Sequence, residues 1–209
     1  DIDLSNTNDD GLEIFGTGVL NDGGAVNIEN IDSLTVNAEV KATGNVTLIT
    51  VDDEDDTGDM QINADVESTG GDVTCSADHD MVMDTDRIRA ENNVTLTADA
   101  DGDSDGDFTQ EKGLISNTDT GDVDISGYDV TLRAIDSTRD VTVTADNDII
   151  LEEPEGVGGG AAVAELLTAT YNSFPSASFN SLNGSKNKFL KKSEISDFRN
   201  NFLIFFEDS

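Results

Sequence analysis

The sequence has little of the material that most active sites use. Its 209 residues include one cysteine (Cys75), one histidine (His79), two prolines, two tyrosines and no tryptophan. A single cysteine excludes a disulfide within the chain. Cys75 lies two residues after Val73 in an alternating segment, so we expect it to be buried and inert. His79 stands between two aspartates, and we expect an exposed turn residue there.

Positive charge is also scarce. The chain has 45 acidic and 11 basic residues, which gives a formal net charge of −34. A protein that binds nucleic acid needs a basic face to neutralise phosphates, so we expect no nucleic-acid partner. Acidic side chains at this density repel one another, which favours bound divalent cations or a salty medium. A solvated acidic surface, as in halophilic proteins, explains the same composition without a bound metal.

Long hydrophobic runs are absent as well. No run of 18 apolar residues and no signal-peptide pattern occurs, so we expect no insertion into a membrane. Charge divides the chain unevenly, because residues 161–209 carry only 5 acidic and 5 basic residues but seven of the nine phenylalanines. We therefore expect an acidic repeat domain at 1–153, a Gly/Pro linker at 154–160 and a second module at 161–209.

The first part contains one recurring phrase: glycine, then Asp or Asn, then an apolar residue that begins an alternating segment. The phrase occurs at 44–48, 58–62, 71–75, 106–109 and 121–125, and without glycine at 93–96, 129–132 and 140–143. The alternation places Val and Leu on one face and Thr on the other, as in a half-buried strand. The glycine is expected to supply positive φ at a corner.

Strands this short cannot bury their inner face alone, but stacked coils of about 20 residues can. Val73 to Val94 and Met60 to Met81 are each 21 residues apart, which suits one coil. A β-sandwich also has short strands and frequent turns. The near-identical phrase favours the solenoid, so we predict a mainly β chain, a parallel β-helix (β-solenoid) with a small C-terminal α-helical module.

Residues 93–103, read with the other copies of the phrase, resemble the repeats of filamentous-haemagglutinin-type surface proteins of bacteria. The resemblance covers roughly residues 24–151. Those families are adhesins and surface filaments. The resemblance therefore implies an exported extracellular or cell-surface protein whose partners are copies of itself, other surface proteins or carbohydrate.

Residues 99–107 alternate carboxylates with other residues before a glycine, like the start of a calcium loop. The register fails at the end, because Lys112 stands where an EF-hand supplies its bidentate Glu. A looser copy lies near residue 53 and another at Asn6, Asn8 and Asp10. A solvated acidic turn explains the same pattern. The candidate calcium ligands are Asp101, Asp103, Asp105, Asp107, Asp53 and Asp55.

A second candidate loop lies near the C-terminus. Residues 176–206 resemble an EF-hand or dockerin unit, although Lys188 replaces the usual glycine and only one predicted ligand is charged. Apolar residues at helical spacing from Val163 to Phe174 and from Ile195 to Phe205 predict two helices. A small helical cap for the solenoid is the alternative. The ligands implied by the resemblance are Asn183, Ser185, Asn187 and Glu194.

These features favour a structural or adhesive surface protein without enzymatic activity, stabilised by calcium and forming part of a filament or sheath. A polysaccharide lyase or hydrolase is the alternative, with Asp84 and Asp86 as acid and base and Arg87 and Arg89 as the basic pair. Ice binding is a third hypothesis, against which the irregular spacing counts. Its candidate threonines are Thr47, Thr74, Thr95, Thr131 and Thr142.

Overall fold

The computed structural model describes residues 1–7, 11–52, 58–152 and 167–169. The regular elements of this part are all β-strands, and it has no helix that is long and apolar enough to cross a membrane. The strands are β1 (Ile2–Asn6), β2 (Leu12–Ile14), β3 (Val19–Asn21), β4 (Val26–Ile31), β5 (Leu34–Val36), β6 (Val40–Ala42), β7 (Val46–Val51), β8 (Met60–Ile62), β9 (Val66–Ser68), β10 (Val73–Ala77), β11 (Met81–Ala90), β12 (Val94–Thr97), β13 (Phe108–Asn117), β14 (Val123–Gly127), β15 (Val130–Leu132), β16 (Ile135–Asp136), β17 (Val141–Ala145), β18 (Ile149–Leu151) and β19 (Leu167–Ala169).

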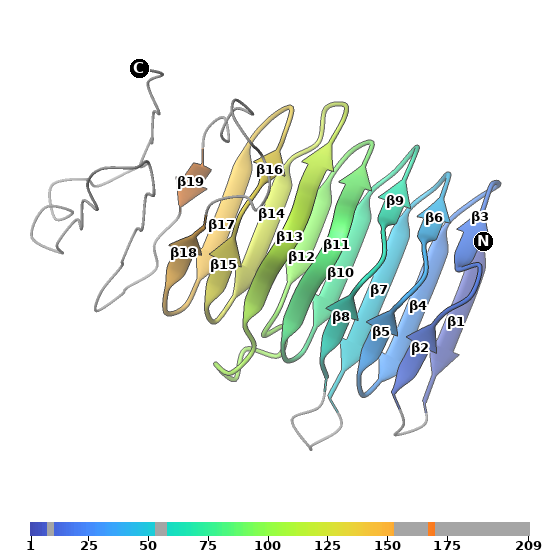
Figure 1. The fold of residues 1–209 in the computed structure, drawn as a ribbon, viewed down its shortest axis with the longest axis horizontal. Helices are drawn as coiled ribbons and strands as arrows, with labels where there is room; N and C mark the ends of the chain where they lie inside the picture. Colours follow the sequence, from blue (N-terminus) through green and yellow to red (C-terminus); the bar gives the residue numbers. More distant parts are fainter. Residues whose placement is uncertain (8–10, 53–57, 153–166, 170–209) are drawn as a thin grey trace, which may run out of the picture.

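The strands stack into a parallel β-solenoid (Figure 1). Sheet A has the order β1-β4-β7-β10-β12-β14-β17-β19. Sheet B faces it and has the order β18-β15-β13-β11-β8-β5-β2, with the short strands β3, β6, β9 and β16 beside this path. The chain alternates between the sheets, so each coil adds one strand to sheet A and one long or two short strands to sheet B. The prediction of a parallel β-solenoid is therefore confirmed, and the β-sandwich is excluded because all pairings are parallel.

The predicted coil length is also confirmed. Val73 pairs with Val94 and Met60 pairs with Met81, so both spacings of 21 residues correspond to one coil. Other coils differ in length: Val94 pairs with Val123, which lies 29 residues further on. The extra residues of that coil lie mainly in the turn segment 98–107, so the strands stay in register.

The core consists of stacked columns of apolar side chains from both sheets. Two of these columns are Val26, Val46, Val73, Val94, Val123 and Val141 in sheet A, and Leu34, Met60, Met81, Phe108, Val130 and Ile149 in sheet B. Cys75 lies in this core and is fully buried, as expected, and burial raises the pKa of its thiol to about 12. The thiol is therefore protonated at neutral pH and unreactive.

The reason for the phrase glycines differs from the expectation. The glycines with positive φ are Gly16, Gly18, Gly102 and Gly113, none of which begins a strand with the phrase. A Cβ at Gly71 would instead lie 2.9 Å from the backbone nitrogen of Asn45 in the preceding coil. The phrase therefore needs glycine because successive coils approach closely at this corner, and the prediction of positive φ there is wrong.

The Asp or Asn of the phrase joins successive coils. At the corner before sheet A, the side-chain oxygen of Asn45 accepts the N–H of Asp72 at 3.0 Å. Asp72 accepts the N–H of Asn93 at 3.0 Å, and Asn93 accepts that of Asp122 at 2.9 Å. These bonds satisfy backbone N–H donors at the ends of the strands. A buried N–H group without a hydrogen-bond partner would lower the stability of the fold.

The C-terminal predictions lie almost entirely outside the described residues. Within the predicted helix at 163–174, residues Leu167–Ala169 form strand β19, which pairs with β17. The helical prediction is therefore wrong for these three residues. The linker 154–160 and the loop ligands Asn183, Ser185, Asn187 and Glu194 lie outside the described part.

Candidate cation-binding corner

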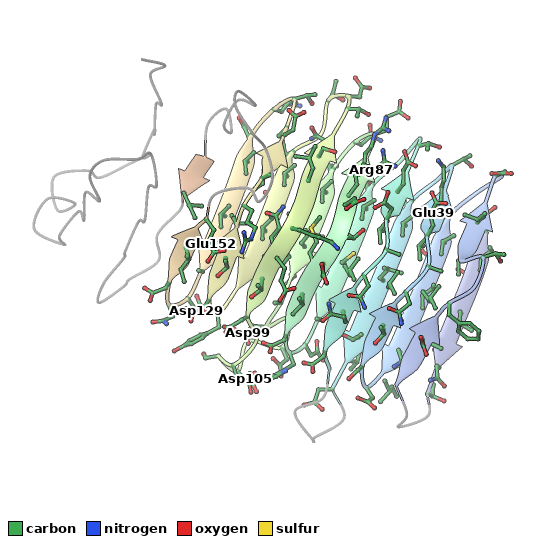
Figure 2. All side chains as sticks on the ribbon, viewed as in Figure 1. Glu39, Arg87, Asp99, Asp105, Asp129 and Glu152 are labelled. Atoms are coloured by element: carbon green, nitrogen blue, oxygen red, sulfur yellow. The ribbon has the colours of Figure 1, made fainter. Side chains whose placement is uncertain are left out.

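Several acidic turns lie side by side at one edge of the solenoid. This edge, here called the acidic corner, consists of the segments that lead from sheet A to sheet B: 32–33, 52 and 58–59, 78–80, 98–107, 128–129 and 146–148. Figure 2 shows Asp99, Asp105 and Asp129 along this edge, while Glu39 and Arg87 lie towards the opposite edge. Turns distant in sequence therefore become neighbours because the coils stack.

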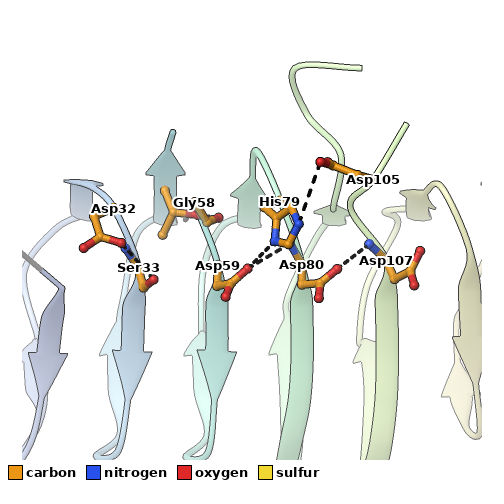
Figure 3. A network of polar contacts seen from close by, with 9 residues as sticks. Asp32, Ser33, Gly58, Asp59, His79, Asp80, Asp105 and Asp107 are labelled. Carbon is orange, nitrogen blue, oxygen red and sulfur yellow. Dashed lines mark hydrogen bonds and ion pairs between the residues drawn. The ribbon is translucent and has the colours of Figure 1, made fainter. Parts of the chain in front are cut away.

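A ladder of aspartates runs along the acidic corner (Figure 3). The carboxylate of Asp80 accepts the N–H of Asp107 at 2.8 Å, and that of Asp107 accepts the N–H of Asp129 at 3.0 Å. The ladder continues from Asp129 to the N–H of Asp148 at 2.8 Å, and begins at Asp59, which accepts the N–H of Asp80 at 3.3 Å. Each carboxylate thus joins its coil to the next.

Stacking these carboxylates has an electrostatic cost. Burial and the neighbouring charges of Asp129 and Asp80 raise the pKa of Asp107, although its hydrogen bond from Asp129 opposes the rise. Burial and nearby aspartates also raise the pKa values of Asp78 and Asp99. A raised native pKa means that the folded state binds protons more tightly than the unfolded chain does. Protons, or a cation in their place, therefore stabilise this corner.

His79 lies in the turn 78–80 of the acidic corner and is partly buried there. Its side chain is 24% exposed, its Nδ1 lies 2.5 Å from Asp59 Oδ1, and its Nε2 lies 3.9 Å from Asp105 Oδ2. Burial lowers the pKa of His79, but the hydrogen bond to Asp59 and the charges of Asp80, Asp59 and Asp105 raise it overall. His79 lies in the turn 78–80, as expected, but the expectation that it is exposed is wrong, because three successive coils meet at this ring.

The raised pKa of His79 predicts a pH-dependent contribution to stability. The contribution is fully present below the ordinary value of 6.5 and is lost as the pH rises through the raised native pKa. We expect a loss of about 1 kcal/mol, since the contact is partly exposed. Urea unfolding of the wild type and His79→Gln between pH 6 and 9 measures it. Parallel stability curves for the two proteins would contradict the prediction.

Two groups of side chains bring metal-ligating atoms together. In one, Asp99, Asp101 and Asp103 place their ligand atoms within 4.8 Å of one another, and in the other Asp59, His79 and Asp80 do so. The first group lies on the turn 98–107, where Asp99 Oδ1 accepts the N–H of Ser104 at 3.0 Å. Carboxylate oxygens in such a group suit a hard cation such as calcium.

The structure gathers only part of the predicted calcium set. Asp101 and Asp103 lie together, whereas Asp105 faces His79 and Asp107 belongs to the coil-to-coil ladder. Asp99 takes the third place, and the sequence signal for it was present, because the alternation of carboxylates begins at residue 99. Asp53, Asp55, Asn8 and Asp10 lie outside the described residues.

Residues 102–106 also match the Gly-x-Ser-x-Gly pattern of serine hydrolases. In those enzymes the serine lies on a turn from a strand to a helix. Here the turn leads from strand β12 to strand β13. Ser104 is exposed, and within the described contacts no hydrogen bond joins its hydroxyl to His79. The pattern therefore lacks the context that its chemistry requires.

The basic residues considered for a polysaccharide site already pair with carboxylates. Glu67, whose side chain is 5% exposed, lies 2.6 Å from Lys41 and 3.1 Å from Arg89, and 3.6 Å from Arg87. Burial raises the pKa of Glu67, but the contacts with Lys41 and the two arginines lower it overall. Asp84, one of the two candidate acids, pairs with Lys112 at 2.9 Å. These contacts join neighbouring strands of sheet B.

Comparison with protein-family models, curated proteins and solved structures gave no match. The function proposed below is therefore based on the sequence and the geometry.

Proposed function

We propose that this chain is a rigid structural segment of an exported, cell-surface or extracellular protein, with an adhesive or filament-forming role and with calcium bound at the acidic corner. The observation that carries the proposal is the joining of successive coils by side-chain hydrogen bonds at both corners. The aspartate ladder at one corner and the Asn45–Asp72–Asn93–Asp122 ladder at the other run in parallel along the solenoid axis.

This construction favours a stiff rod. Each coil contacts only its neighbours, so the length of the rod grows with the number of coils, as in other repeat proteins. The in-register core and the two ladders resist bending or sliding of one coil on the next. A rod that holds its binding parts away from a surface is what adhesins and filaments need, and the resemblance to surface repeats favours the same role.

Calcium is the cation that fits the acidic corner best. It takes six to eight oxygen ligands in flexible geometry, and carboxylates from Asp99, Asp101 and Asp103 supply part of such a set. Burial and the charges of neighbouring aspartates raise the pKa values of Asp99 and Asp107, and a bound cation would offset both effects by neutralising the carboxylates. Magnesium demands a stricter octahedron and dehydrates reluctantly, so it fits an exposed turn less well.

Calcium is expected to raise the melting temperature of the chelated protein. A ligand that binds only the native state at 100 times its Kd adds about 2.7 kcal/mol. The double variant Asp101→Asn/Asp103→Asn should lose most of this shift, while Asp119→Asn/Asp136→Asn, which removes the same charge away from the acidic corner, should keep it. Calorimetry with a calcium titration measures both.

An equal shift from sodium chloride at matched ionic strength would contradict specific binding and leave only charge screening. Electron microscopy of the same samples tests the structural role. Rods that join end to end or bundle in calcium support it, whereas separate short particles at all calcium concentrations contradict the filament role.

A further inference from the structure

The outer face of sheet A carries a regular array of hydroxyl groups. Side chains at alternate positions of a strand point to the same face, so each of the sheet A strands β7, β10, β12, β14 and β17 contributes two outward residues. We call the resulting surface the hydroxyl face. Its two columns are Thr47, Thr74, Thr95, Asp124 and Thr142, and Ile49, Ser76, Thr97, Ser126 and Thr144.

The array is in register because the irregular part of each coil lies elsewhere. The pairings from β7 to β17 contain no bulge, whereas those between β11 and β13 in sheet B shift at Asp84. The irregular spacing of the threonines in the sequence counted against a flat threonine face. The structure shows that the extra residues lie in turns such as 98–107, outside the strands. Thr131 belongs to sheet B, and Asp124 occupies its expected place in the column.

The hydroxyls of this face have no hydrogen-bond partner among the residues that the structure describes. Over the described residues, the threonines and serines of the two columns make no hydrogen bond through their side chains, and all are half-buried. Neighbouring threonines lie about 4.8 Å apart across strands and about 6.6 Å along a strand. The β-branched side chain of threonine is stiff at χ1, so the hydroxyls and methyls form a fixed grid.

The hydroxyl face is also nearly free of charge. Asp124 is its one charged residue among the ten positions, on a chain with a net charge of −34. The basic residues of the described part lie instead on sheet B and its adjoining turns, as Lys41, Arg87 and Arg89 do. A charged group orients water around itself, whereas a hydroxyl both donates and accepts a hydrogen bond as water does.

We propose that the hydroxyl face binds the surface of ice. Liquid water and ice offer the same hydrogen bonds, so only a partner with fixed, repeating positions distinguishes them. The grid repeats in two directions over several coils, so many weak contacts act on one rigid body and reinforce one another. Water molecules that bind these hydroxyls would take regular positions, because the side chains are stiff. The threonine methyl groups fill the spaces between the hydroxyls.

Other occupants fit this face less well. The ten positions include no aromatic side chain to stack on the rings of a crystalline polysaccharide. A second copy would bring another strongly negative chain against a face with little apolar area to bury. The inference goes beyond the structural role proposed above and does not depend on calcium binding.

Ice shaping and thermal hysteresis of the full chain, measured by nanolitre osmometry, test this proposal. The wild type should produce faceted crystals and a gap between melting and freezing. Thr95→Lys should abolish both, because it places a long charged side chain in the centre of the grid. Thr109→Lys, an outward, half-buried threonine of sheet B, should leave both unchanged. Asp124→Thr, which completes the column, should widen the gap.

Circular dichroism melts of each variant separate loss of binding from loss of folding. Round, unfaceted crystals from a folded wild type would overturn the proposal, and so would equal losses in Thr95→Lys and Thr109→Lys. A dimer in sedimentation velocity that Thr95→Lys dissolves, without ice shaping, would assign the face to a second copy. Pull-down on cellulose or chitin without ice shaping would assign it to polysaccharide.

Discussion

Gly113→Ala is expected to destabilise the protein by at least about 3 kcal/mol. Gly113 has a φ of 81°, and a Cβ there would overlap the carbonyl oxygen of Thr85 on the neighbouring strand β11. The residue lies where β13 passes the irregular pairing with β11 near Asp84. A single methyl group therefore meets both a strained backbone and another coil. Equilibrium unfolding in urea measures the loss as a lower midpoint.

Three further glycines separate the two causes. Gly121→Ala overlaps the backbone of Asn92 at ordinary φ, so we expect about 2 kcal/mol from the close approach alone. Gly16 has positive φ, but no atom lies near the position that a Cβ would take, so we expect Gly16→Ala to lose about 1 kcal/mol of stability from backbone strain alone. Gly23→Ala has neither and should change stability by less than about 0.5 kcal/mol. Equal midpoints for Gly113→Ala and Gly23→Ala would contradict the close packing of coils.

Gln110→Met is expected to cost about 3–5 kcal/mol. The side chain of Gln110 is fully buried, and its Nε2 donates to the carbonyl oxygens of Gly113 and Ala134, each at 2.9 Å. Its Oε1 accepts the N–H of Arg133 at 2.9 Å and that of Ala134 at 3.2 Å. The methionine has similar size but leaves these buried backbone groups without partners.

Gln61→Met provides the matched control. Gln61 points outward from β8 and donates to Asn63 at 2.8 Å in an exposed position, so we expect a change below about 0.5 kcal/mol. Urea unfolding compares the two variants under the same conditions. If Gln110→Met unfolds at the midpoint of Gln61→Met, the four hydrogen bonds of Gln110 contribute no net stability.

Several features followed from short-range patterns in the sequence. The alternation in each copy of the phrase predicted strands with one apolar face, and the spacing of Val73 from Val94 predicted the coil. The burial of Cys75 followed from its position two residues after Val73, which places both side chains on the same face of the strand. The helical prediction was wrong for residues 167–169, because apolar spacing along the chain carries no information about the pairing of this segment with β17.

Other features depend on which residues meet when coils stack. The sequence places His79 between two aspartates, but only stacking brings Asp59 and Asp105 to its two ring nitrogens. The grouping of Asp99 with Asp101 and Asp103 depends in the same way on the path of a long turn.

By itself, the sequence determined that the strands are short, alternating and repeated, and hence that they stack into a parallel solenoid with an acidic surface. Only the tertiary structure decided the register of the coils. Spacing along the chain varies from coil to coil, and the choice of residues that leave the strand for a turn is made by packing against the neighbouring coil. Threonines that are irregularly spaced in the sequence therefore form a regular hydroxyl face. The extra residues of the longer coils lie in the acidic corner, and the core columns keep the strands aligned.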